Sequence, residues 1–146
     1  MVMTTRQFHD PHLTGRPADA ARQTAAEILA GPHLAILSTT NPDGAPQSSV
    51  IFVKPDGDDL LFSTIEGRRK TRNMRRDPRV SLLLHGDTGV YATVSGTVEL
   101  VDDPTGEFHQ VVYDLHMGGA TPPAEPGAER LIVRLHPTRT YAPPAY

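Results

Sequence analysis

The chain of 146 residues contains no cysteine and no tryptophan, and only two of its 14 basic residues are lysines. Without cysteine there is no disulfide framework, no thiolate nucleophile and no cysteine-based zinc or iron–sulfur site. No apolar run approaches the roughly 18 residues of a membrane span, and the N-terminus lacks the apolar stretch of a secretory signal. We therefore expect a cytoplasmic protein that binds no membrane, with one domain at residues 17–146 and a flexible arm at residues 1–16.

Two further binding classes are poorly supported. The seven histidines are scattered, and because no His-x-His pair or Glu-x-x-His motif joins them, no metal site is expected. The chain has four Phe, four Tyr and a net charge of −3. Such a chain is poor in the aromatic platforms on which bases stack, so nucleic-acid binding is not expected either.

Strong turn signals separate the apolar runs. Asn41-Pro42-Asp43-Gly44 and Pro55-Asp56-Gly57-Asp58 combine a proline that presets φ with a glycine that accepts positive φ. Short runs between such turns, several with alternating apolar and polar residues, predict antiparallel strands. We expect strands over residues 33–40, 45–54, 60–65, 80–85, 90–100 and 130–136. Residues 118–127 predict a loop and residues 138–146 a tail. Because no βαβ rhythm is present, the order predicts a mainly β fold, a small barrel with helices at its flanks.

Three helices are expected beside these strands. Their predicted bounds are Pro17 to Gly31, residues 68–76, and a third helix with Asp103 as N-cap and Pro104 as first residue. In this third helix Phe108, Val111, Val112 and Leu115 lie on one face, which is typical of an amphipathic helix. The helix and the loop after it could border a binding groove, since loops on a rigid barrel commonly carry function.

Half of the positive charge is concentrated in one short segment. Seven of the 14 basic residues lie between Arg68 and Arg79, opposed there only by Asp77, so this segment carries +6 in an acidic chain. Such a concentration indicates that the segment binds an anion, although charge runs on solvated surfaces are also common.

The expected helix over this segment separates its residues by face. Arg68, Arg69, Arg72, Arg75 and Arg76 share one arc. Lys70 and Met74, four residues apart, share the opposite face. Met74 is the only apolar member and must face the core, which directs Lys70 along the barrel wall. Ser63 and Thr64, near the end of the preceding strand, bring hydroxyl groups to the N-terminus of the helix, where free N–H groups favour a phosphate.

Four segments together resemble a known family. They are residues 33–40 (HLAILSTT), 41–47 (NPDGAPQ), 61–64 (LFST) and 67–81 (GRRKTRNMRRDPRVS). They are similar to the split β-barrel flavin and deazaflavin oxidoreductases, the pyridoxamine 5'-phosphate oxidase-like proteins. Within these, the likeness is greatest to the branch that uses the deazaflavin coenzyme F420.

The resemblance implies a six-stranded antiparallel split β-barrel of the FMN-binding type, forming a homodimer with the cofactor in a groove between the barrels. It implies that the anionic tail of the cofactor is bound by Ser63, Thr64, Arg68, Lys70 and Asn73, with Thr71 beside them. Gln47 and Ser49 would lie near the ring, and Tyr91 would make a more distant contact. No catalytic side chain is expected, because hydride leaves the reduced ring directly and passes to a small-molecule substrate.

Two questions stay open at the level of sequence. FMN has one phosphate, whereas coenzyme F420 has a phosphodiester and a polyglutamyl tail, and spread cations best match a spread anion. We therefore expect coenzyme F420, with FMN as the alternative. A non-catalytic flavin- or deazaflavin-binding protein is the second alternative to an enzyme.

Overall fold

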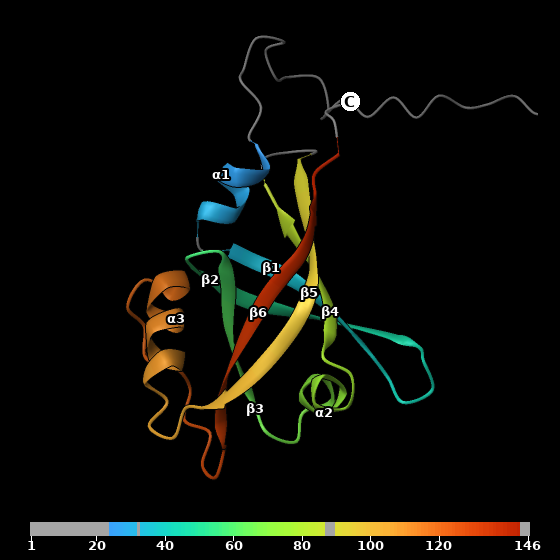
Figure 1. Cartoon of the computed structure of the whole chain (residues 1–146). Helices are drawn as coiled ribbons and strands as arrows, with labels where there is room; N and C mark the ends of the chain where they lie inside the picture. Colours follow the sequence, from blue (N-terminus) through green and yellow to red (C-terminus); the bar gives the residue numbers. More distant parts are fainter. Residues whose placement is uncertain (1–23, 32, 87–89, 144–146) are drawn as a thin grey trace, which may run out of the picture.

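The computed structural model describes residues 24–31, 33–86 and 90–143 (Figure 1). The expected arm at residues 1–16 lies outside these ranges. The elements are α1 (Ala25–Ala30), β1 (His33–Thr40), β2 (Pro46–Asp56), β3 (Asp59–Ile65), α2 (Arg69–Arg76), β4 (Arg79–His85), β5 (Tyr91–Asp102), α3 (Glu107–Met117) and β6 (Arg130–Tyr141). Within the described ranges, no helix has the length and apolarity needed to cross a bilayer.

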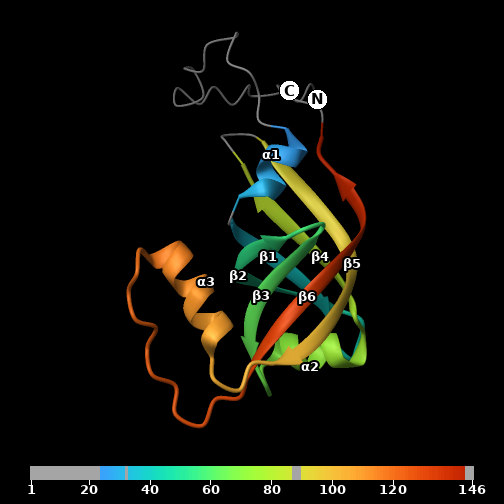
Figure 2. The same ribbon diagram turned by 60° about the vertical axis from the view of Figure 1, so that its left-hand side comes forward.

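The six strands form a closed barrel in the order β1-β2-β3-β6-β5-β4, and every neighbouring pair is antiparallel. This confirms the predicted mainly β, six-stranded barrel. The core is made of inward-facing residues from all strands, including Leu37, Val53, Phe62, Val94 and Val133, all at 0% exposure. Figures 1 and 2 show α1 near one end of the barrel, α2 near the opposite end, and α3 beside β2 and β3.

Helix α1 begins at Ala25, and the predicted start at Pro17 lies outside the described residues. Thr24 is extended, and its hydroxyl accepts a hydrogen bond from the N–H of Glu27 while the Glu27 carboxylate accepts one from the N–H of Thr24. This capping box fixes the helix start at Ala25. The predicted end at Gly31 is confirmed, since Gly31 is the C-cap.

The predicted start of α3 at Asp103 and Pro104 is wrong. The N–H of Gly106 donates to the carbonyl of Asp103, closing a turn, and Gly106 is the N-cap with φ of 68°. The Asp103 carboxylate nevertheless accepts hydrogen bonds from the N–H groups of Phe108 and His109 at 3.5 and 3.2 Å. Asp103 therefore satisfies the first turn of α3 as a cap would, from outside the helix.

The apolar face predicted for α3 is only partly buried. Val112 is 3% exposed, whereas Val111 and Leu115 are 41% and 47% exposed in the single chain. Val111 and Leu115 therefore lie on the part of the apolar face that the barrel of the single chain does not cover.

Strand β6 is longer than predicted, and residues 138–141 belong to it and not to a tail. A register shift at Ser95 and Gly96 of β5 carries the pairing past Pro137 to Tyr141. A side chain at Gly96 would collide with the carbonyl of His136. Glycine is therefore required at this bulge for the two backbones to approach.

The barrel opens between β2 and β3. These strands pair only at Lys54–Leu61, Pro55–Leu60 and Asp56–Asp59, next to their hairpin turn. Beyond these pairs β2 stays paired with β1, and β3 stays paired with β6. The two strands therefore diverge from each other, and the space between them lies beside the N-terminus of α2 and beside α3.

Candidate functional site

The junction of β3 and α2 is fixed by buried side chains. Met74 is 1% exposed and anchors α2 on the barrel, as predicted. The Thr71 hydroxyl donates to the carbonyl of Ile65 at 2.8 Å and lies 2.9 Å from the hydroxyl of Thr64. Because Thr71 uses its single proton for Ile65, Thr64 must be the donor in the second bond. These contacts hold the first turn of α2 against the end of β3.

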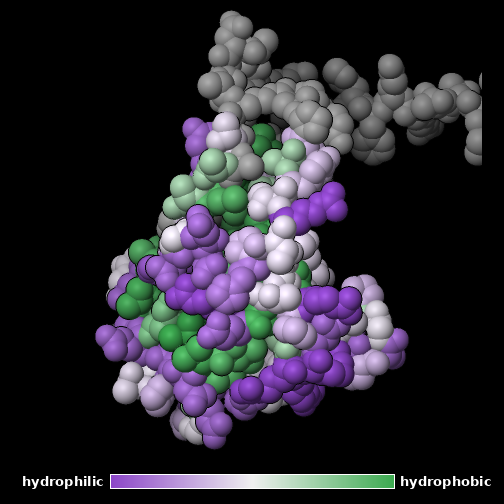
Figure 3. Space-filling view, viewed as in Figure 1, coloured by the Kyte–Doolittle hydropathy of each residue, from purple (hydrophilic) through white to green (hydrophobic). Residues whose placement is uncertain are grey.

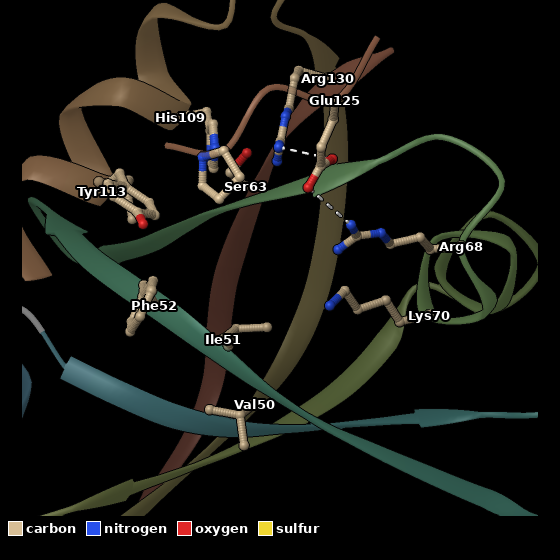
Figure 4. Close-up of a pocket in the computed structure, with 12 residues that line it drawn as sticks. Val50, Ile51, Phe52, Ser63, Arg68, Lys70, His109, Tyr113, Glu125 and Arg130 are labelled. Atoms are coloured by element: carbon tan, nitrogen blue, oxygen red, sulfur yellow. Dashed lines mark hydrogen bonds and ion pairs between the residues drawn. The ribbon is translucent and has the colours of Figure 1, made fainter. Parts of the chain in front are cut away.

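A pocket of about 180 Å³ lies at the opening between β2 and β3. Its lining combines apolar residues of β2 and α3 with polar residues of β3, α2, the loop after α3 and β6. These are Val50, Ile51, Phe52, Ser63, Arg68, Lys70, His109, Val112, Tyr113, Pro123, Glu125 and Arg130. Figure 4 shows Glu125 between Arg68 and Arg130, with the side chain of Lys70 beside that of Arg68.

Lys70 and Ser63 each have a polar group that an anionic ligand could satisfy. Burial lowers the pKa of Lys70, and the nearby Arg68 lowers it further. The hydroxyl oxygen of Ser63 is buried and has no hydrogen-bond partner. An anion in the pocket would offset the repulsion at Lys70 and accept a hydrogen bond from Ser63, so the two groups fit a phosphate.

The pocket also carries an ion-pair cluster. The Glu125 carboxylate lies 3.1 Å from Nη2 of Arg130 and 3.5 Å from Nη2 of Arg68 (Figure 4). Beside them, burial and the charge of Arg130 lower the pKa of His109. The lowered pKa favours the neutral imidazole, which offers one donor and one acceptor. The ring of His109 lies 6.0 Å from that of Tyr113.

The side chain of Asn73 is buried and forms hydrogen bonds within the chain. It is 2% exposed, and its amide donates to the Thr39 hydroxyl and to Oδ1 of Asn41, both at 3.0 Å. Thr39 in turn donates to Oε1 of Gln47 at 2.8 Å. The predicted ligands Asn73 and Gln47 are thus two ends of one network, which ties α2 to the hairpin of β1 and β2.

Three of the nine predicted site residues, all of them within the described ranges, line the pocket: Ser63, Arg68 and Lys70. Thr64 and Thr71 lie behind it at 1% and 0% exposure, with their protons already used. Ser49 on β2 has a second buried hydroxyl without a partner. Tyr91, at the start of β5, pairs with His85 and does not line this pocket.

The sequence did not assign His109, Tyr113, Glu125 and Arg130 to the site. Arg130 reaches it because β6 pairs with β3 so that Arg130 lies opposite Ile65, next to the start of α2. That register depends on strand pairing between distant segments and leaves no local signal. Helix α3 and the loop after it both contribute residues to the lining of this pocket.

Charge and apolarity are segregated on the surface. Figure 3 shows strongly hydrophilic residues over the region of α2 and a hydrophobic area beside it on the same face. Elsewhere, Leu34, Ile36 and Val50 are 55%, 45% and 60% exposed. Ile36 and Val50 are cross-strand partners on β1 and β2, and Val50 also lines the pocket. An exposed apolar patch therefore adjoins the pocket.

The sequence profile of the pyridoxamine 5'-phosphate oxidase family matches residues 21–142. A curated pyridoxine/pyridoxamine 5'-phosphate oxidase of Rubrobacter xylanophilus is 35% identical over 68 residues, which make up 45% of this chain and 31% of that protein. The match thus spans about a third of that relative's length.

Solved structures give a wider match. An F420 reductase superimposes with a TM-score of 0.74 at 31% identity, covering 83% of this chain and 98% of the other. An FMN-binding protein from Nostoc punctiforme, described as related to pyridoxamine 5'-phosphate oxidase, gives a TM-score of 0.56 at 14% identity, covering 75% of this chain and 73% of the other. At that identity the second likeness shows a common fold alone.

Proposed function

Because the chain belongs to the pyridoxamine 5'-phosphate oxidase family, we propose that it is an oxidoreductase that uses reduced coenzyme F420. Its reaction would transfer a hydride to an unsaturated, conjugated small organic substrate. The observation that carries the proposal is the pocket between β2 and β3, where Lys70, Arg68 and the partnerless hydroxyl of Ser63 surround a space suited to an anion. The likeness to an F420 reductase at 31% identity favours this cofactor.

The residues present fit the anionic part of such a cofactor. Lys70, Arg68 and Arg130 supply three positive charges and Ser63 supplies a hydroxyl donor, while Glu125 supplies the only carboxylate among the lining residues. When bound, the reduced deazaflavin supplies the hydride. The chain's part is to hold the tail at α2, to orient the ring along the apolar wall of Val50 and Phe52, and to exclude water.

A second copy of the chain would complete the site. The pocket of about 180 Å³ is smaller than the roughly 300–1,000 Å³ typical of sites that enclose a cofactor. The patch of Leu34, Ile36 and Val50 adjoins it and is exposed in the single chain. We therefore propose a homodimer in which this patch is covered and the partner forms the missing wall of the groove.

FMN is the alternative cofactor, since Lys70, Arg68 and Ser63 would also satisfy one phosphate. Three cationic side chains are spread across the lining of the pocket. Spread cations favour coenzyme F420, whose anionic part is longer than that of FMN. The affinities of coenzyme F420 and FMN, measured in separate titrations, decide between them. We expect tighter binding of coenzyme F420; binding of FMN with none of the deazaflavin would reverse the order.

Turnover separates the enzyme from a binding protein. We expect reduced coenzyme F420 to be oxidised in the presence of enones or quinones, as followed by its absorbance. Binding of the cofactor without oxidation across such a panel would instead support a non-catalytic carrier.

A further inference from the structure

Glu125 occupies the place where a ligand anion would be bound. Its two oxygens face different cations, Oε1 toward Arg68 and Oε2 toward Arg130 (Figure 4). The Arg130 side chain is only 14% exposed, so it needs a counter-ion whenever the pocket holds no ligand. Glu125 meets that need with a carboxylate from the chain itself.

The segment that carries Glu125 is weakly attached. Among the described residues, no backbone hydrogen bond joins residues 121–127 to another element; the carbonyl of Glu125 accepts from Ala128 within the same loop. Gly119 and Gly127 flank this stretch with φ of 81° and 77°, a region open to glycine at little cost. The two ion pairs of Glu125 are therefore the described polar contacts that hold the middle of the loop over the pocket.

We propose that Glu125 is a built-in competitor for the anion site, and that an incoming ligand must displace its carboxylate from Arg68 and Arg130. The inference rests on the proposed function, since it concerns the same pocket. A tethered carboxylate acts at a high effective concentration, so a free monocarboxylate of equal charge does not replace it. A phosphate dianion, or a chain of several anionic groups, gains enough from Lys70, Arg68 and Arg130 together to open the loop.

Glu125 therefore selects ligands by the charge of the group at this end of the pocket. Phosphorylated or polyanionic cofactors are accepted, and compounds with a single carboxylate are refused. Uncharged riboflavin does not compete with Glu125 at all, so its affinity is independent of this residue.

The test uses the full chain and pyrophosphate, an anion that lacks the flavin or deazaflavin ring and therefore probes the anion site alone. In Glu125→Gln the side chain keeps its size and loses its charge, and Glu129→Gln is the matched control, because Glu129 lies in the same loop and takes part in none of the described ion pairs. Binding is followed by tyrosine fluorescence, which Tyr113 in the pocket lining makes informative. We expect E125Q to bind pyrophosphate about five-fold more tightly than wild type, and E129Q to match wild type.

Equal affinity of E125Q and wild type for pyrophosphate would overturn the inference. An equal increase in affinity in E125Q and E129Q would also overturn it, because it would show that the net charge of the surface, and not Glu125 itself, controls binding. If E125Q does not fold, Glu125→Asp decides in the same way, since a shorter carboxylate pairs less well and should also raise the affinity. If wild type binds neither coenzyme F420 nor FMN, the proposed function fails, while the pyrophosphate comparison still decides the role of Glu125.

Discussion

The hydroxyl groups of Thr64 and Thr71 lie 2.9 Å apart, at 1% and 0% exposure, where β3 turns into α2. The resemblance to a cofactor-binding family implies a ligand contact for both residues. In the structure Thr71 donates its hydroxyl proton to the carbonyl of Ile65, and Thr64 donates its own to the hydroxyl of Thr71. They position the strand end and the helix start that carry Ser63, Arg68 and Lys70.

Replacing Thr71 by valine should destabilise the protein. The change removes the shorter of two hydrogen bonds to the carbonyl of Ile65, which keeps only the N–H of Arg68 at 3.4 Å. It also leaves the buried hydroxyl of Thr64 without its partner, and such a loss costs about 1–3 kcal/mol. Urea unfolding measures this loss, and Thr71→Ser, which keeps the hydroxyl, should lose less. A valine variant as stable as wild type would show that the two bonds do not matter for folding.

Replacing Lys70 by methionine should have opposite effects on stability and on binding. Burial and Arg68 lower the pKa of Lys70, so its charge is disfavoured in the folded protein without ligand. Methionine removes that charge and should raise the melting temperature without cofactor. Affinity for coenzyme F420 or FMN should fall by about 1–3 kcal/mol, the scale of a charge-assisted hydrogen bond.

Calorimetry of the Lys70 variant with and without cofactor measures both quantities. Arg69→Met, a change at an exposed position outside the pocket lining, is the control and should alter affinity much less. Unchanged affinity in the Lys70 variant would place the anion elsewhere.

Replacing Ile36 by lysine should dissociate the proposed dimer. Ile36 is 45% exposed and lies opposite Val50 in the apolar patch beside the pocket, and burying an unpaired charge in an interface is costly. Sedimentation should show a dimer for wild type and a monomer for this variant. Val101, which is 46% exposed on β5, provides the control, and Val101→Lys should leave the dimer intact.

His136 should make stability depend on pH. Hydrogen bonds to Glu99 and then Asp59 raise the pKa of His136 above its usual value of 6.5. A raised pKa means that the folded state binds the proton more tightly than the unfolded state. The stabilisation is therefore complete below about pH 6.5 and is lost as pH rises through the raised pKa.

Wild type should have a higher melting temperature than His136→Gln at mildly acidic pH. This difference in melting temperature should decrease as the pH becomes mildly alkaline. The comparison isolates His136, because His109, whose pKa is lowered by burial, is present in both proteins and contributes equally to each. An advantage that stays constant with pH would indicate that His136 does not change its charge in this range.

The strands were predictable because their signals are local. The turn residues around Gly44 and Gly57 separate β1, β2 and β3, and the bounds of β1 match the prediction. The long reach of β6 was not predictable, because it depends on a bulge at Gly96 in another strand. The start of α3 was misplaced since a buried Asp103 can cap a helix from three residues upstream of its N-cap.

The candidate site was predictable only for residues that lie close to one another in the sequence. Ser63, Arg68 and Lys70 follow one another along one strand and helix, and their spacing alone brings them to a common place. Glu125 and Arg130 join them through the pairing of β6 with β3, a contact between segments some 65 positions apart (Ile65 with Arg130). Thr71 and Asn73 fit the family pattern equally well in sequence, yet their buried hydrogen bonds to neighbours give them a supporting role.

Phe62 and Ser63 are adjacent on β3, but one belongs to the core and the other to the pocket. Where β2 and β3 separate, two neighbouring residues of one strand thus serve different purposes. A substitution at Ser63 can change what the opening accepts, while the interior packing supplied by Phe62 is left untouched.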